Sequence, residues 1–206
     1  MIVKEVLDTI RESNIPMINS YEAHFYEINK LLTAQTIEKF GLPSPEIYDC
    51  FYSKDQPKYH SISYPCILKP NCGGRTTYTY IVYDEQELKD ILSSIDVNIE
   101  FIVQRYIEPV KGYTTRIEVI DGECYSILKR TVAENGLAAY HLGSKYLEYD
   151  NCPEEIRQAA INTMKHLKID MGSLDIIEGS DGFFIIDVNS VSNFAPENIE
   201  MFGFNM

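Results

Sequence analysis

Long apolar stretches are missing from this sequence. No run approaches the roughly 18 consecutive apolar residues that a membrane-spanning helix needs, so we expect no membrane partner. The first residues, MIVKEVLDTIRES, mix charged and apolar positions, which is unlike the apolar core of a secretory signal. The sequence also lacks internal repeats and low-complexity linkers, which favours an ordinary globular fold.

Positive charge is scarce as well. The 206 residues carry 18 Lys and Arg against 31 Asp and Glu, which gives a formal net charge of −13. Proteins bind a nucleic-acid backbone mainly by neutralising its phosphates with Lys and Arg, so we expect no nucleic-acid partner. A small anionic ligand is compatible with this composition only if a few cations are concentrated in one place.

Cysteine is present without a pattern. The five cysteines form no CxxC pair and have no regular spacing. An odd number of cysteines without a signal peptide indicates a reducing compartment, so we predict a cytoplasmic protein.

Short apolar segments alternate irregularly with helical patterns. Periodicity predicts helices over 2–13, 21–39, 84–94 and 153–168. It predicts strands around 46–52, 64–69, 78–83, 101–105, 114–120 and 123–130, and a hairpin over 173–189, whereas 131–150 has little pattern. The order indicates an α+β fold in which helices separate small antiparallel groups of strands.

The hairpin ends in FFIIDVN, residues 183–189, where polar side chains follow a buried strand. If Ile177 pairs with Phe183 across a five-residue loop, Asp175 lies opposite Ile185 and Ser173 opposite Asp187. Asp175, Asp187 and Asn189 then share one face, because side chains repeat every two residues along a strand. Three such oxygen donors suit Mg²⁺. The alternative is that Asp187 and Asn189 merely end the strand, as such residues often do.

A glycine pair follows another short strand in YPCILKPNCGGRTTYTYIV, residues 64–82. Glycine lets main-chain N–H groups approach phosphate oxygens, and Lys69 at the strand end supplies a positive charge. By itself this pattern is also typical of a plain hairpin turn. Lys30, Arg116 and Arg130 are further candidate cations, and Arg116 stands among apolar strand residues.

Taken in order, these segments resemble the ATP-grasp superfamily. The resemblance is carried by the entry segment of residues 15–48 with its lysine helix and GLPSP turn, by YPCILKP, FIVQRYIE and GYTTRIEVIDGECYSILKR, and by MGSLDII…FFIIDVNS. The branch they resemble contains the glutamate ligases that extend a ribosomal protein tail and the carrier-protein ligases of lysine biosynthesis. The resemblance implies two lobes of antiparallel sheet with helices and a nucleotide cleft between them.

The family pattern implies a role for each matching residue. Arg116 and Arg130 would face the transferred phosphoryl group and the acceptor carboxylate. Asp175, Asp187 and Asn189 would hold Mg²⁺. ATP would be bound by Lys30, Lys69, Gly73, Gly74, Arg75, Thr76, Gln104, Arg105, Tyr106 and Ile107, with residues 73–76 as a flap over the phosphates and residues 104–107 along the adenine.

The implied activity is ATP- and Mg²⁺-dependent ligation of a carboxylate to an amine through an acyl phosphate, with a small molecule or a peptide as substrate. The chain would divide into a remnant or docking segment of a missing N-terminal α/β domain (1–20), a first lobe with the phosphate flap (21–104) and a second lobe with the metal strands (105–206). The missing domain leaves open a homo-oligomer or a partner subunit in its place.

Two departures from the family pattern keep alternatives open. Asp187 stands where the branch usually has Glu, and Arg75 stands where the flap usually has a small residue. These features are compatible with an ATP-grasp kinase that phosphorylates a hydroxyl. A catalytically reduced nucleotide-binding module is the third interpretation.

Overall fold

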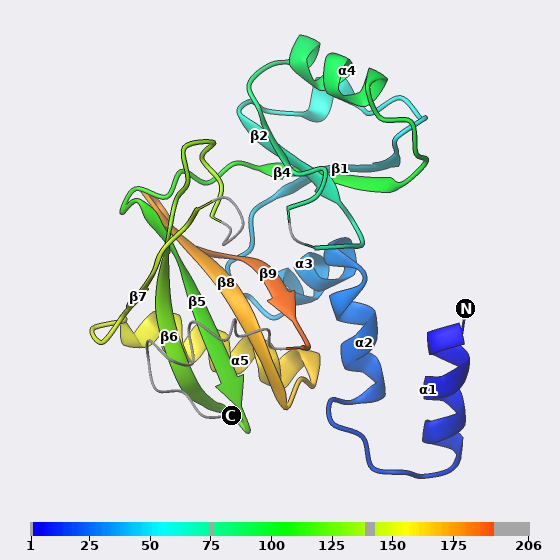
Figure 1. Cartoon of the computed structure of the whole chain (residues 1–206), viewed down its shortest axis with the longest axis vertical. Helices are drawn as coiled ribbons and strands as arrows, with labels where there is room; N and C mark the ends of the chain where they lie inside the picture. The colour runs from blue at the N-terminus through cyan, green and yellow to red at the C-terminus, as the bar shows by residue number, and fades with distance from the viewer. Residues whose placement is uncertain (1, 75, 139–142, 192–206) are drawn as a thin grey trace.

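The computed structural model describes residues 2–74, 76–138 and 143–191. Within them, two antiparallel sheets stand one above the other, and α3 lies between them (Figure 1). This arrangement agrees with the predicted α+β class. None of the helices in these residues has the length and apolar character needed to cross a bilayer.

The first sheet has four strands in the order β1-β4-β2-β3 and carries α4 on its outer face (Figure 1). Alternation along β2 buries Cys66 and Leu68 beneath α4 and turns Ile67 and Lys69 the other way, toward the second sheet. The elements are β1 (Ile47–Tyr52), β2 (Cys66–Pro70), β3 (Tyr80–Val82), α4 (Glu85–Ser93) and β4 (Glu100–Arg105).

The second sheet has five strands in the order β7-β6-β5-β8-β9, and α5 covers one of its faces (Figure 1). Ile156, Met164 and Leu167 of α5 pack in one core with Leu174 and Ile176 of β8. The strands are β5 (Tyr113–Ile120), β6 (Glu123–Thr131), β7 (Tyr146–Glu148), β8 (Met171–Gly179) and β9 (Gly182–Asn189), and α5 spans Glu154–Leu167. The short β7 lies in the stretch for which the sequence predicted no element.

The helix predicted over 21–39 is wrong in one respect, because it is two helices, α2 (Tyr21–Glu27) and α3 (Lys30–Lys39). The side chain of Asn29 accepts a hydrogen bond from Leu32 N and so starts α3 afresh. Ala23 and Ile37 of these helices lie in the core beneath the second sheet. The sequence grouped them with the first lobe, and the division into domains stays a prediction.

The first helix, α1 (Ile2–Glu12), agrees with the prediction and stands at the edge of the molecule (Figure 1). Asp8 accepts a 2.6 Å hydrogen bond from the Tyr21 hydroxyl, which attaches α1 to α2. Val3 and Val6 of α1 are exposed. The role of residues 1–20 as a docking segment stays a prediction.

Candidate functional site

A cleft of about 860 Å³ opens between the two sheets. Its size lies within the range of small-molecule sites, about 300–1,000 Å³. Of the predicted site residues, Arg75 lies outside the described residues. All the others line this one cleft: Lys30, Lys69, Gly73, Gly74, Thr76, Gln104, Arg105, Tyr106, Ile107, Arg116, Arg130, Asp175, Asp187 and Asn189.

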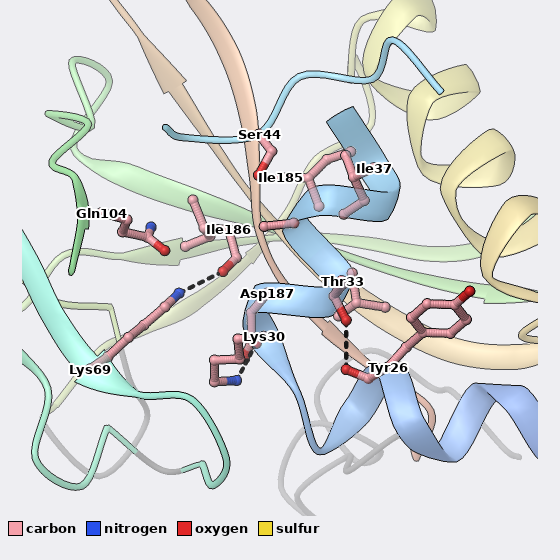
Figure 2. A pocket seen from close by; sticks show the side chains of 12 residues that line it. Tyr26, Lys30, Thr33, Ile37, Ser44, Lys69, Gln104, Ile185, Ile186 and Asp187 are labelled. Carbon is pink, nitrogen blue, oxygen red and sulfur yellow. Dashed lines mark hydrogen bonds and ion pairs between the residues drawn. The ribbon is translucent and has the colours of Figure 1, made fainter. Parts of the chain in front are cut away.

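Two lysines from different elements meet over β9. The ammonium of Lys30, at the start of α3, lies 2.6 Å from Asp187 Oδ1. The ammonium of Lys69, near the end of β2, donates a 2.9 Å hydrogen bond to the main-chain oxygen of Ile186, as Figure 2 shows. Burial lowers the pKa of Lys69 to about 8, although Asp187 opposes the shift. Two cations are therefore held side by side at the floor of the cleft.

The register of the β8–β9 hairpin differs from the prediction. Glu178, not Ile177, pairs with Phe183, because a tight turn between Gly179 and Gly182 replaces the expected five-residue loop. That one-residue slip alone would turn Asp175 and Asp187 to opposite faces.

A β-bulge at Ile186 compensates for the slip. The bulge inserts one extra residue into β9, so that Asp175 lies directly opposite Asp187 and Ser173 opposite Asn189. The predicted shared face is thus reached by a different pairing. The bulged residue also supplies the carbonyl that binds Lys69. No pattern in the sequence indicated this bulge.

Two arginines converge on Asp175 from the neighbouring strands. Arg116 of β5 approaches its Oδ1 to 3.4 Å, and Arg130 of β6 donates a close hydrogen bond to the same oxygen. Burial by itself would raise the pKa of Asp175, but the two guanidinium groups outweigh burial and hold the pKa below its ordinary value. Asp175 is therefore an anion in the folded protein.

Arg116 is itself held from two further sides. Its Nε donates to Glu118 Oε1 at 2.9 Å, and its Nη2 donates to Ser173 Oγ at 2.6 Å. Burial alone would lower the pKa of Arg116, but Asp175 and Glu118 raise it above the ordinary value. The guanidinium is thus a fixed positive charge. Glu118 is almost fully buried, and sequence reasoning assigned it no role.

The donor set at the end of the hairpin fits a hard divalent cation in its chemistry. Asp175 and Asp187 contribute carboxylates from paired positions, and Asn189 contributes an amide oxygen two residues farther along β9. Mg²⁺ prefers such oxygen ligands. Among the described residues, no group of three or more His, Cys, Asp or Glu forms a metal site, so the amide is essential to this set.

The end of β4 and the start of the segment that joins the two sheets border the cleft, from Gln104 to Ile107. Arg105 forms a 2.6 Å ion pair with Asp181 in the β8–β9 turn. Its guanidinium is therefore directed to the second sheet, while the main chain of this segment borders the cleft. The turn packs closely here, because a Cβ added at Gly179 would lie 2.8 Å from Ile107 Cγ2.

Some lining residues were absent from the predicted set. Thr77 and Thr79 extend the glycine loop, and Thr114 and Tyr146 lie beside Arg130 on the second sheet. Thr114 follows a glycine and a tyrosine in an ordinary strand pattern, so no local signal distinguished it.

Known proteins support the fold and place the chain in a family. The structure of D-alanine–D-alanine ligase from Bacillus anthracis matches with a TM-score of 0.76 at 19% identity, covering 96% of this chain and 69% of that one. The structure of the ATP-grasp ligase PsnB complexed with precursor peptide PsnA2 and AMPPNP matches with a TM-score of 0.65 at 20% identity, covering 96% and 60%. These likenesses confirm the predicted ATP-grasp fold.

Sequence comparison agrees with the structural likeness. Human N-acetylaspartylglutamate synthase A is 23% identical over 188 residues, which cover 88% of this chain and 47% of the relative. The chain spans about half the length of the curated relatives it matches. The model of the RimK-like ATP-grasp domain matches residues 27–203, which is most of the sequence. The chain therefore belongs to the RimK-like ATP-grasp domain family, as its motifs predicted.

Proposed function

We propose that this chain carries the catalytic cleft of an ATP- and Mg²⁺-dependent carboxylate–amine ligase. The observation that supports it most is the meeting of Lys30 and Lys69 with Arg116 and Arg130 in one cleft, beside the Asp175–Asp187–Asn189 donor set. Polyphosphate needs cations, and a metal needs oxygen donors, so one ligand, MgATP, accounts for both groups. The names of the relatives, which are amide-forming ligases, agree with this activity.

The reaction we propose has two steps. A carboxylate oxygen of the substrate attacks the γ-phosphorus of ATP, an oxygen–phosphorus bond forms, and the bond to the β–γ bridging oxygen breaks to release ADP. The amine nitrogen then attacks the acyl carbon, phosphate leaves, and the nitrogen loses a proton. Phosphoryl transfer of this kind depends mainly on positioning and charge stabilisation rather than on side-chain bond making.

The chain's own groups have distinct tasks in this scheme. Lys69 and Lys30 bind the phosphates, and the main chain at Gly73 and Gly74 closes over them. Arg116 and Arg130 stabilise charge on the transferred phosphoryl group and orient the acceptor carboxylate. Asp175, Asp187 and Asn189 would hold Mg²⁺, which supplies Lewis-acid stabilisation of the phosphate oxygens when bound. The hinge residues 104–107 border the adenine.

The test measures ADP release in a coupled assay with ATP and Mg²⁺. Three probe sets cover the chemistry of the relatives: N-acetylaspartate with glutamate, D-alanine alone, and a glutamate-ended peptide with glutamate. A ligase releases ADP only when carboxylate and amine are both present, whereas a kinase needs one acceptor. We expect Asp187→Ala to abolish Mg²⁺-dependent binding of AMPPNP in calorimetry while the thermal unfolding transition remains. Unchanged binding in Asp187→Ala would contradict the metal assignment.

A further inference from the structure

Asn71 lies one residue beyond β2 and is 3% exposed. Its polar groups are all engaged. Its main-chain N–H donates to Glu100 O at 2.8 Å and its side-chain amide donates to Glu100 Oε2 at 2.5 Å. Its main-chain oxygen accepts from Lys30 N at 3.0 Å, and its Oδ1 accepts from Leu31 N at 2.8 Å.

These contacts connect two parts of the molecule that have separate cores. Glu100 begins β4 of the first sheet, whereas α3 packs beneath the second sheet through Ile37. The first N–H groups of a helix have no partner inside the helix. Asn71 satisfies those of Lys30 and Leu31, so the start of α3 is fixed to the end of β2.

Lys30, whose main chain is fixed in this way, carries a positive charge at a position where that charge disfavours the helix. Lys30 is the first residue of α3, where the positive end of the helix dipole disfavours a further positive charge. Its ammonium nevertheless points to Asp187 at the floor of the cleft, as Figure 2 shows. Helix stability therefore does not account for a lysine at this position. The hydrogen bonds from Lys30 N and Leu31 N to Asn71 hold the start of the helix, and with it Lys30, in place.

We propose that Asn71, supported by Glu100, is a positioning residue that sets Lys30 beside Lys69 for binding the phosphates of a nucleotide. This role rests on the proposed function, because it concerns the phosphate end of the same cleft. Asn71 is not among the described residues that line the cleft, so it acts through Lys30 rather than by touching the ligand. Lys69 lies on β2, two residues before Asn71, so both lysines are connected to this one residue.

An exchange of the two anchoring groups tests the proposal. Asn71→Asp keeps the acceptor for Leu31 N but sets a second carboxylate against Glu100. Glu100→Gln keeps one oxygen as the acceptor for the Asn71 amide, and its NH2 group can face Cys50. In the double variant the amide introduced on β4 donates to the carboxylate introduced after β2, which restores the link with the same net charge. Asn98→Asp, at an exposed position, is the control for added charge.

The readout is the Kd of AMPPNP with Mg²⁺, measured by calorimetry beside the Kd of adenosine. We expect Asn71→Asp to raise the Kd of AMPPNP about tenfold or more, as is typical when a buried group loses its partner. We expect Glu100→Gln and Asn98→Asp to stay within about threefold of wild type, and the double variant to recover most of the loss. Adenosine, which has no phosphate, keeps its affinity throughout.

The outcomes separate this inference from the proposed function. If wild type binds no AMPPNP, the proposed function fails and the positioning role fails with it. If wild type binds AMPPNP, three results would each overturn the role of Asn71 alone: an unchanged Kd in Asn71→Asp, no recovery in the double variant, or an equal loss of adenosine affinity. In Asn71→Asp, repulsion between the two carboxylates moves the acceptor away from Leu31 N. Amide hydrogen exchange at Leu31, fast in that variant and slow again in the double variant, therefore checks this contact directly.

Discussion

Replacing Lys69 by Met is expected to stabilise the protein while removing its nucleotide affinity. Burial lowers the pKa of Lys69 from 10.5 to about 8, so at pH 7 the folded protein holds a charged group in an unfavourable setting. At about 1.4 kcal/mol for each step of one in pKa, the cost is at most about 3.4 kcal/mol. Water in the cleft screens part of it, and Met loses the hydrogen bond to Ile186, so we expect a net gain of about 1–2 kcal/mol.

The stability difference between wild type and Lys69→Met should depend on pH in a definite direction. The unfolded chain keeps the Lys69 proton to about pH 10.5, whereas the folded protein releases it at about pH 8. Between these values the unfolded state binds more protons, so wild-type stability rises with pH relative to the Met variant. The difference in unfolding free energy should therefore be largest at pH 7 and shrink above pH 8, when measured by urea unfolding.

Two results would refute this reasoning. A Met variant that is less stable than wild type at pH 7 would mean that the ammonium makes stronger contacts than its burial costs. A stability difference that does not change between pH 7 and pH 9.5 would mean that Lys69 does not titrate there. Lys54→Met, at an exposed position, is the control for adding an apolar side chain. If Lys69→Met loses AMPPNP binding and Lys54→Met does not, then the charge of Lys69 lowers stability but is required for nucleotide binding.

Three further predictions concern the same cleft. We expect the affinity of wild type for AMPPNP to fall as pH rises through about 8, by up to about tenfold per pH unit, because the ammonium of Lys69 must be charged; calorimetry checks this, and a flat profile contradicts it. Arg116→Ala leaves the buried Glu118 without its guanidinium and should cost about 3–5 kcal/mol of unfolding free energy. Adding Glu118→Gln should recover stability but not ADP release, whereas recovered turnover would remove Arg116 from the chemistry. Gly172→Ala should cost about 1–3 kcal/mol and weaken Mg²⁺-dependent binding, because its Cβ would overlap the main-chain oxygen of Asn189; unaltered thermal unfolding would contradict this.

Sequence reasoning succeeded where a motif and a local period agree. A strand was predicted around residues 64–69 with Lys69 at its end, and β2 spans Cys66–Pro70. The helix predicted from residue 21 does begin there, because the side chain of Ser20 accepts a hydrogen bond from Ala23 N. Such features depend on neighbours within a few residues, which the sequence displays directly.

The features that the sequence could not supply depend on contacts between distant segments. The bulge at Ile186 is such a case, since Pro43 O accepts from the neighbouring Ile185 N and Lys69 binds the Ile186 carbonyl. Periodicity in 183–189 contains none of these partners. The contacts of Asn71 with Glu100 and Leu31 were missed for the same reason, since both partners lie far away in the sequence. By its local sequence alone, an asparagine shortly before a glycine pair is typical of a turn.

The charge of the cleft reconciles the acidic composition of the chain with the polyanionic ligand that we propose. The chain has a net charge of −13, yet the described charged residues that line the cleft are five cations against two anions: Lys30, Lys69, Arg105, Arg116 and Arg130 against Asp175 and Asp187. This surplus is the local concentration of positive charge that the composition made necessary for any anionic ligand.

The cations of the cleft also occupy its carboxylates: Lys30 pairs with Asp187, and both Arg116 and Arg130 pair with Asp175. A bound triphosphate would take over those cations and free the carboxylate oxygens for a metal, so nucleotide and Mg²⁺ should bind with positive coupling. Calorimetry of AMPPNP with and without Mg²⁺ measures that coupling, and equal affinities would mean that the carboxylates keep their cation partners.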